Sequence, residues 1–301
     1  MTSNDLHWDD LRIFLAVARS ESLSGAGKIL RVDPATVGRR IARLEERMGA
    51  PLFAKSPQGY AMTDAGQRLL VHAERAEQAL AGALEEVRGQ PGTLSGQIRI
   101  GAPDGCANYL LPQVCMRIMQ DNPDLEVQIV ALPRVVNLSR READMAIAVS
   151  PPATGRLLVQ KITDYRLHLA AARSYLDHHP PIRALDDLRG HRIIGYIPDM
   201  IFDKELDYLH EIGVERVAMA SNSVPVQFNW VCQGGGIGVV HDFAIPSGQG
   251  IRRILPDLIS LTRSFYLIRH ADDRRLERLN RFAVALCDGL KAEVQRLEAQ
   301  S

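Results

Sequence analysis

The sequence predicts two folded parts of different class: a small helical module with a β-hairpin, and a larger α/β part that follows one long helix. Three observations support this prediction. Apolar residues recur at helical spacing up to Met48, a turn containing Pro57 and Gly59 follows, and from Gly96 onward short apolar strands alternate with helices. At 301 residues the chain is also longer than one hydrophobic core usually organises.

The composition is that of an ordinary globular protein, with 46% apolar and 24% charged residues. The first eight residues are polar, and no apolar run approaches the ~20 residues that a membrane span needs, so we expect a cytoplasmic protein without a membrane partner. The four cysteines are scattered without metal-ligand spacing. We therefore expect packed, reduced thiols, with no metal site and no cofactor.

The net charge of zero hides a local excess of positive charge. Between Lys28 and Lys55 there are seven Lys or Arg residues and three acidic ones. Such a basic stretch is the electrostatic footprint of a nucleic-acid-binding surface.

Two helices are predicted before this basic stretch. Apolar residues from Leu11 to Ala18 recur at helical spacing, which predicts a first helix over about 8–20. Ser22 is a plausible N-cap for a short second helix. Gly25 and Gly27 inside it cost up to ~1 kcal/mol each relative to Ala, so tertiary packing has to hold this helix.

The third helix has the clearest start signal in the chain. Asp33 can cap free N–H groups, and Pro34 follows at the first helical position, where its missing N–H costs nothing. The helix is expected to end at Gly49, a residue suited to the left-handed C′ position. Its inner, apolar stripe consists of Val37, Ile41, Leu44 and Met48.

The opposite face of this helix is basic, which predicts a helix-turn-helix whose second helix enters the major groove of DNA. Small residues near its start let the backbone approach the bases, and arginines reach guanine edges or phosphates. A face that is merely solvated is the alternative for an isolated helix. The candidate DNA-binding residues here are Ala35, Thr36, Gly38, Arg39, Arg40 and Arg43, with Arg47 on the same face.

A short hairpin is predicted directly after the helix, with Pro57 and Gly59 in its turn. Such a hairpin beside a helix-turn-helix is a wing. Lys55, Ser56 and Gln58 are expected at its tip, placed to touch phosphates or the minor groove.

The ordered motifs of this region resemble the signature of LysR-type transcriptional regulators. They are the run from Leu11 to Ala18, Ser22-Leu-Ser, the run from Val32 to Glu45, Met48-Gly-Ala-Pro-Leu-Phe and Met62-Thr-Asp-Ala-Gly. Two positions depart from the family pattern: Gly38 stands where a phosphate-contacting Ser is usual, and Gln58 where the wing often carries Arg. The resemblance implies DNA binding, while these departures leave open which residues read the sequence.

One long helix is predicted from Thr63 or Asp64, either of which can cap it, to about Arg88. Its apolar residues recur at alternating spacings of four and three, a heptad seam whose small Ala positions allow another helix to approach closely. The alternative is a helix packed on its own domain. The resemblance favours a homodimer or homotetramer on a double-stranded, pseudo-palindromic operator. The seam residues are Leu69, Ala73, Ala76, Leu80, Ala83 and Val87.

The remaining chain predicts mostly parallel sheets covered by helices, which bind ligands at the carboxyl ends of their strands. A helix is expected over 108–120, and strands over 97–102, 126–131, 144–149, 167–172, 192–196, 217–220, 237–240 and 264–269.

This part resembles the sensing domain of LysR-type regulators, which is similar to periplasmic solute-binding proteins. The matching stretches include Ile98-Arg-Ile-Gly-Ala, Ala143-Asp-Met-Ala-Ile and Val231-Cys-Gln-Gly-Gly-Gly-Ile-Gly. The resemblance implies two α/β lobes, two crossover strands and a small-molecule effector between the lobes. The predicted organisation is a winged helix-turn-helix over 1–63, a linker helix over 64–93, and an effector-binding domain over 94–301, whose first lobe is about 94–164 and 267–291 and whose second is about 165–266.

Candidate effector contacts follow from the positions at which strands end. Asp104 places a negative charge at a helix start where the family often has Ser or Thr, which favours a ligand with hydrogen-bond donors over a simple mono-anion. A plain N-cap is the alternative for Asp104, as ordinary turn formation is for the others. The candidates are Asp104, Gly105, Cys106, Arg134, Ser150, Tyr196 and Asn222.

Other classes of protein fit less well. The glycines from Gly234 to Gly238 suggest a nucleotide loop, but a dinucleotide fingerprint needs strand, glycines and helix in that order, and the order here is reversed. We therefore expect no catalytic residues. A solute-binding transport component would need an export signal and no basic winged helix. An architectural or repressor protein that binds DNA without a ligand remains the open alternative.

Overall fold

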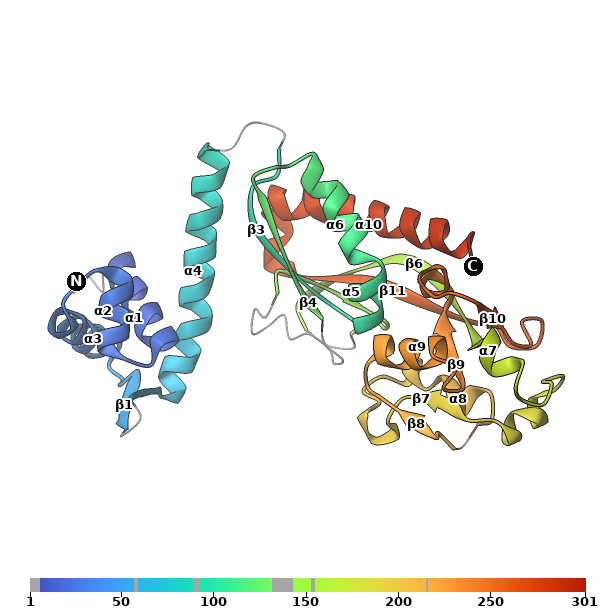
Figure 1. The fold of residues 1–301 in the computed structure, drawn as a ribbon. Helices are drawn as coiled ribbons and strands as arrows, with labels where there is room; N and C mark the ends of the chain where they lie inside the picture. The colour runs from blue at the N-terminus through green and yellow to red at the C-terminus, as the bar shows by residue number, and fades with distance from the viewer. Residues whose placement is uncertain (1–5, 57–58, 89–92, 132–142, 153–154, 215) are drawn as a thin grey trace. The chain divides into compact units, whose positions relative to one another are not determined.

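The computed structural model describes residues 6–56, 59–88, 93–131, 143–152, 155–214 and 216–301 (Figure 1). The chain divides into two compact units, Met1–Gly89 and Gln90–Ser301. Each unit has a hydrophobic core of its own.

The N-terminal unit is a helix-turn-helix with a two-stranded wing, and its helices lie where the sequence predicts them. The wing strands pair antiparallel, with Phe53 opposite Met62. Its elements are α1 (Trp8–Ser20), α2 (Leu23–Leu30), α3 (Pro34–Met48), β1 (Phe53–Ser56), β2 (Gly59–Met62) and α4 (Asp64–Arg88).

The helix ends follow from local chemistry. The Asp33 side chain accepts hydrogen bonds from the backbone N–H groups of Ala35 and Thr36, and Gly49 takes the left-handed conformation that ends α3. For α4, Thr63 is the cap, since its hydroxyl accepts from Gly66 N at 3.1 Å. Gly66 itself is needed there, because an added Cβ would lie 2.2 Å from the carbonyl oxygen of Leu52.

The core of the N-terminal unit includes the first part of α4. Leu69 and Ala73 are buried together with Phe14, Val17 and Leu44 of this same unit. The predicted seam is therefore divided: its first two positions pack within their own unit, as the alternative interpretation held, while Leu80 is 43% exposed.

The C-terminal unit contains the predicted α/β elements, with differences at several boundaries. The helix predicted over 108–120 is two helices, since the backbone departs from helical geometry at Leu110. The strand predicted over 167–172 begins ten residues earlier, and β10 and α10 were not predicted. The elements are β3 (Gly96–Ala102), α5 (Asp104–Tyr109), α6 (Leu111–Gln120), β4 (Leu125–Ala131), β5 (Met145–Ala148), β6 (Leu157–Ala172), α7 (Arg173–Leu176), η2 (Leu185–Gly190), β7 (Ile193–Gly195), η3 (Pro198–Met200), η4 (Lys204–Leu206), α8 (Tyr208–Glu211), β8 (Met219–Ala220), α9 (Val224–Cys232), β9 (Ile237–His241), η5 (Asp242–Ser247), β10 (Ile251–Arg253), β11 (Leu261–His270), η6 (Ala271–Arg275) and α10 (Glu277–Glu298).

Two long strands connect two α/β lobes in this unit (Figure 1). In the first lobe β3 pairs parallel with β4 and β5, and in the second β7 pairs parallel with β8 and β9. The long strands β6 and β11 pair antiparallel with each other and extend into both lobes. The carboxyl ends of β3 and β5 in the first lobe therefore lie near segments of the second lobe.

Helix α10 packs on both lobes. It contacts α6 of the first lobe, and it also contacts η5 and β6 of the second. Its end is fixed to the second lobe because Glu298 accepts hydrogen bonds from Arg166 N and Arg166 Nε on β6. The helix thus continues beyond residue 291, where the sequence placed the end of the first lobe.

Candidate functional site

A buried carboxylate on α1 orients helix α3. Asp10 is buried, and its two oxygens lie 3.0 Å from the guanidinium of Arg47 and 3.9 Å from Nε of Arg40. A buried carboxylate is costly unless it is paired, so these contacts fix how α3 is rotated against α1. Arg47, which the helical pattern placed on the outer face, turns toward α1, and Arg40 is shared between Asp10 and solvent.

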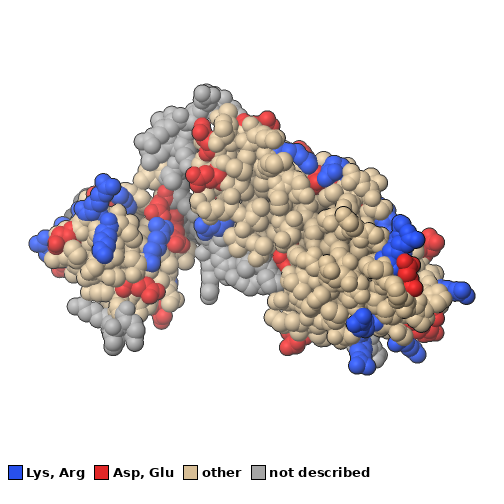
Figure 2. Space-filling model, viewed as in Figure 1, with Lys and Arg blue, Asp and Glu red and all other residues tan. Residues whose placement is uncertain are grey.

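The remaining predicted residues of α3 lie on its outer side. Arg39 and Arg43 are exposed, and Arg39 donates a hydrogen bond to the Thr36 hydroxyl at 3.0 Å. Ala35 is exposed at the start of the helix. Gly38 is half-buried beside Leu23 of α2, where an added Cβ would lie 3.3 Å from the Leu23 side chain. Figure 2 shows Lys and Arg side chains on the surface of this unit.

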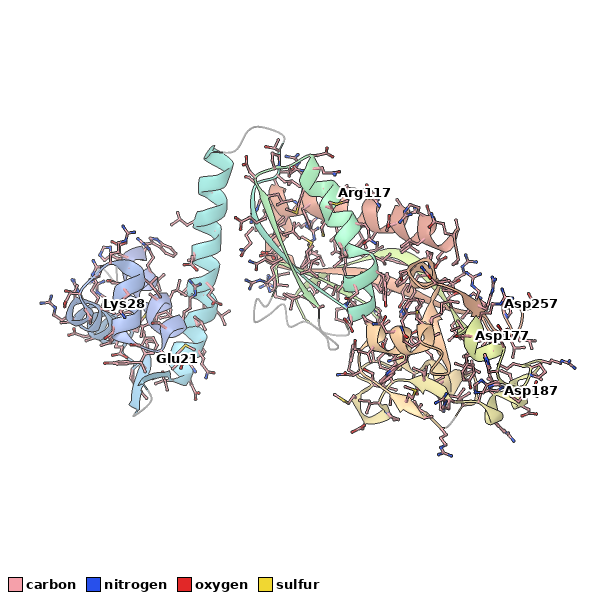
Figure 3. The ribbon with its side chains drawn as sticks, viewed as in Figure 1. Glu21, Lys28, Arg117, Asp177, Asp187 and Asp257 are labelled. Carbon is pink, nitrogen blue, oxygen red and sulfur yellow. The ribbon has the colours of Figure 1, made fainter. Side chains whose placement is uncertain are left out.

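The wing is fixed to the helices by hydrogen bonds that the backbone N–H groups in and beside its strands donate. Tyr60 N donates to the carbonyl oxygen of Glu21, and Gly59 lies so close to that oxygen that a Cβ would approach it to 2.5 Å. Glu21, which follows α1, is labelled in Figure 3. At the other strand, Glu45 accepts from Leu52 N and Phe53 N. Of the predicted tip residues, Lys55 and Ser56 lie at the end of β1, and Gln58 lies outside the described residues.

In the second unit Asp104 connects the two lobes. It is the first residue of α5, and one of its carboxylate oxygens accepts from the Ser223 hydroxyl of the second lobe at 2.6 Å. The other oxygen accepts from Asn108 Nδ2 at 2.7 Å. Pro103 holds the N-cap position of α5 and Asp104 is its first helical residue, so Asp104 is not a plain N-cap.

Ser150 makes a second contact between the lobes. It follows β5 of the first lobe, and its hydroxyl donates to the Asp203 carboxylate of the second. Between these two contacts the lobes enclose a cavity of only about 20 Å³, which is room for one water molecule. The cleft is therefore closed in this structure.

The structure brings five of the predicted effector residues together around this cavity: Asp104, Gly105, Cys106, Tyr196 and Asn222. Ser150 lies beside it through its neighbour Val149, and Arg134 lies outside the described residues.

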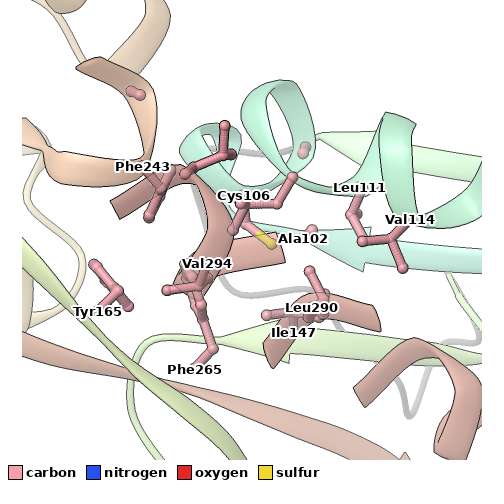
Figure 4. Close-up of a cluster of buried hydrophobic side chains, with 14 of the residues drawn as sticks. Ala102, Cys106, Leu111, Val114, Ile147, Tyr165, Phe243, Phe265, Leu290 and Val294 are labelled. Atoms are coloured by element: carbon pink, nitrogen blue, oxygen red, sulfur yellow. The ribbon is translucent and has the colours of Figure 1, made fainter. Parts of the chain in front are cut away.

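Cys106 is a core residue more than a ligand contact. Its side chain extends from α5 into a cluster that includes Ala102, Phe243 and Val294 (Figure 4). Burial raises the pKa of the Cys106 thiol well above its ordinary value, so the group stays protonated and unreactive.

Sequence reasoning missed the aromatic wall of the cleft. Tyr165, Tyr208 and His241 are buried here, and their Tyr165 Oη, Tyr208 Oη and His241 Nδ1 atoms have no hydrogen-bond partner among the described residues. The His241 ring stacks on Tyr165 with 5.4 Å between centroids, and it lies against Gly105, where a Cβ would come within 3.5 Å. His241 is the last residue of β9, so it occupies the kind of strand-end position from which the other candidates were predicted.

Within the described residues no group of three or more His, Cys, Asp or Glu side chains is arranged to hold a metal ion, and no helix is long and apolar enough to cross a membrane. The described residues offer two candidate binding surfaces. One is an exposed basic helix with a wing, and the other is a polar cleft with aromatic walls. A helix-turn-helix unit joined to a two-lobed α/β binding unit defines a ligand-responsive DNA-binding regulator.

Comparison with known families gives the same result. The profile of the bacterial regulatory helix-turn-helix protein, lysR family, matches residues 8–67, and that of the LysR substrate binding domain matches residues 91–290. The chain belongs to the LysR family of transcriptional regulators, which confirms the resemblance and the two-part fold, with a DNA-binding domain, an effector-binding domain and self-association into oligomers.

Individual relatives are distant. The transcriptional activator TtdR of Escherichia coli K12 is 27% identical over 242 residues, covering 76% of this chain and 75% of its own. The regulator PtxR of Pseudomonas aeruginosa is 26% identical over 247 residues, covering 80% and 78%. Among solved structures, CrgA from Neisseria meningitidis has a TM-score of 0.59 at 21% identity over 95% of this chain and 99% of that one. Full-length LysG from Corynebacterium glutamicum with bound effector Arg has a TM-score of 0.62 at 18% identity, covering 97% and 99%.

We expect His241 to make the stability of the effector-binding unit depend on pH. Burial lowers the pKa of His241 from 6.5 to about 3. Between these values the unfolded chain binds a proton that the folded chain does not, so the free energy of unfolding falls as pH falls from 6.5 toward 3, by at most about 1.4 kcal/mol per pH unit.

Urea unfolding of wild type and His241→Phe between pH 4 and 7 measures this effect (about 1 to 3 kcal/mol per M is the usual urea slope). The variant should show a shallower pH dependence, while His210→Phe, at an exposed position, should keep that of the wild type. If the free energy of unfolding changes with pH in the same way for His241→Phe and wild type, His241 is not the source of the pH dependence.

Proposed function

We propose that this regulator reads operator DNA with the outer face of α3 and with the wing, and that a small polar effector binds between the two lobes of the C-terminal unit. The proposal of DNA binding by α3 rests on the different positions of its arginines. Arg47 is held by Asp10, while Arg39 and Arg43 are exposed beside the small residues that permit close approach to bases.

Arg43→Ala should weaken operator binding by about 1 to 3 kcal/mol if the side chain reads a base. Arg40→Ala should have a smaller effect, because part of its charge serves Asp10. Arg12→Ala is the matched control: it removes an exposed arginine that lies beside Asp9 on α1.

Fluorescence anisotropy with an operator fragment, repeated at several salt concentrations, separates two roles of Arg43. A base contact weakens the cognate sequence selectively, whereas a phosphate contact weakens all sequences alike and lowers the salt slope by about one. If Arg43→Ala binds the operator with the affinity of the wild type, α3 is not the helix that recognises the DNA sequence.

The cleft supports the second part of the proposal. Its lobes are joined across the opening by carboxylate–hydroxyl hydrogen bonds, Asp104 with Ser223 and Ser150 with Asp203. Both carboxylates accept hydrogen bonds, so a ligand that replaces the serines has to supply donors. A ligand that contacts both lobes binds the open and closed arrangements with different affinity, which is the requirement for regulation.

A screen of small metabolites by thermal shift should find compounds that stabilise the wild-type chain, and Asp104→Asn should remove that shift, because the substitution removes the negative charge and replaces one acceptor oxygen with an NH2 donor. Asp186→Asn, at a highly exposed position of the second lobe, is the control and should keep it. A shift that survives in Asp104→Asn would place the ligand elsewhere. If no compound acts, the DNA-binding architectural or repressor alternative is favoured.

The oligomer is proposed to form through the outer part of α4. Leu80→Glu would place like charges in an apolar contact and should dissociate the assembly, as multi-angle light scattering measures. Gln67→Glu adds the same charge at an exposed site off the seam and should not. An unchanged mass for Leu80→Glu, with the helix content of the wild type, would move the interface to another surface.

The action proposed here is binding alone. The named relatives are transcriptional regulators, and we infer that this chain works on DNA in the cytoplasm without catalysing a reaction.

A further inference from the structure

The second lobe contains a larger pocket than the cleft between the lobes. Its volume is about 380 Å³, against about 20 Å³ for the inter-lobe cavity. One wall is formed by β7, β9 and Gln227 of α9, and the other by residues of the segment 198–214 together with Val217. This volume is within the range of small-molecule sites, roughly 300 to 1,000 Å³.

The lining is mostly apolar, with few polar groups. Gln227 is buried, and its Nε2 donates to the carbonyl oxygen of Ser221, which leaves the amide oxygen as an acceptor. Asp207 is the half-buried N-cap of α8, and His210 is an exposed residue of the last turn of α8. The apolar lining residues are Ile194, Ile201, Leu206, Leu209, Val214, Val217 and Val239.

Tyr208 separates this pocket from the cleft. It lines both spaces, as Tyr196 and Leu206 do. Tyr208 is 4% exposed, and its hydroxyl interacts electrostatically with the hydroxyl of Tyr165, which lines the cleft and not this pocket.

The same wall is connected to the contacts that close the cleft. Asp203, the acceptor of the Ser150 hydroxyl, belongs to the segment that covers the pocket. The segment rests directly on β7, since a Cβ at Gly195 would lie 2.5 Å from Leu209 Cδ1. The same segment therefore contacts both the pocket and the first lobe.

We propose that this pocket is a second ligand site, distinct from the inter-lobe cleft, that takes a neutral and largely apolar molecule of one to three rings with a single hydrogen-bonding group. Binding there acts on the cleft through Tyr208 and Asp203. The site goes beyond the proposed effector function, because it lies within one lobe and needs no contribution from the other.

The test uses the full chain and the neutral fluorescent probe N-phenyl-1-naphthylamine. Saturable fluorescence enhancement with one probe per chain is expected for the wild type. Val217→Trp fills the pocket and should weaken probe binding at least tenfold, while Val226→Trp, on an exposed part of α9 outside the lining, should bind as wild type. Asp104→Asn should keep one saturable probe site per chain, because Asp104 lines the cleft and not this pocket, which distinguishes the two sites.

A crystal structure of the wild-type chain with the probe makes the test independent of how the variants fold. Density for the probe between β7 and α8 supports the second site. Density only between the lobes, the absence of saturable binding, or equal affinity in a folded Val217→Trp variant overturns it.

Discussion

The antiparallel ladder between β6 and β11 is the constraint on which the effector-binding unit depends. It runs in register from Leu261 opposite Leu167 to His270 opposite Leu157, with an irregularity between Phe265 and Tyr266. Sixteen residues of extended chain in β6 span roughly 50 Å, enough to enter both lobes. Because the ladder is continuous, the lobes cannot separate, and their relative movement is limited to bending and twisting of these two strands. The side-chain hydrogen bonds across the cleft are weak compared with the β6–β11 ladder. A small ligand therefore has enough binding energy to replace them.

Buried carboxylates set the positions of functional elements in both units. Asp10 decides which arginines of α3 remain available, and it does so from a different helix. In the second unit Asp242 is fully buried between His168 and Arg253, and Arg253 also contacts Ser301. An unpaired charge in such a place costs several kcal/mol, roughly 3 to 5 when one partner is removed. These pairs therefore specify one arrangement of the packed elements.

Local signals in the sequence were enough for the N-terminal elements and for most strands. Asp33-Pro34 and Gly49 define α3 because capping depends on adjacent residues. Local signals do not predict which residues far apart in the sequence come into contact. Asp10 reads as an outer residue of α1 until α3 is packed against it. Tyr165 and His241 meet only through the register of β6 with β9, and Tyr208 reaches His241 from α8. The break at Leu110 was missed because apolar residues continue across it, so periodicity alone predicts one helix.

The order of the elements along the chain has a consequence for synthesis on the ribosome. Everything that the helix-turn-helix core needs is present once α4 has been made, so this unit is able to fold while the rest is translated. The first lobe is different, because α10 and β11 complete it only after the whole second lobe has been produced. Until then α6 and β5 expose apolar surface, and closing so long a loop slows folding. A nascent chain with a finished DNA-binding unit and an unfinished effector unit is thus an unavoidable stage, and it is the stage at which chaperones are most needed.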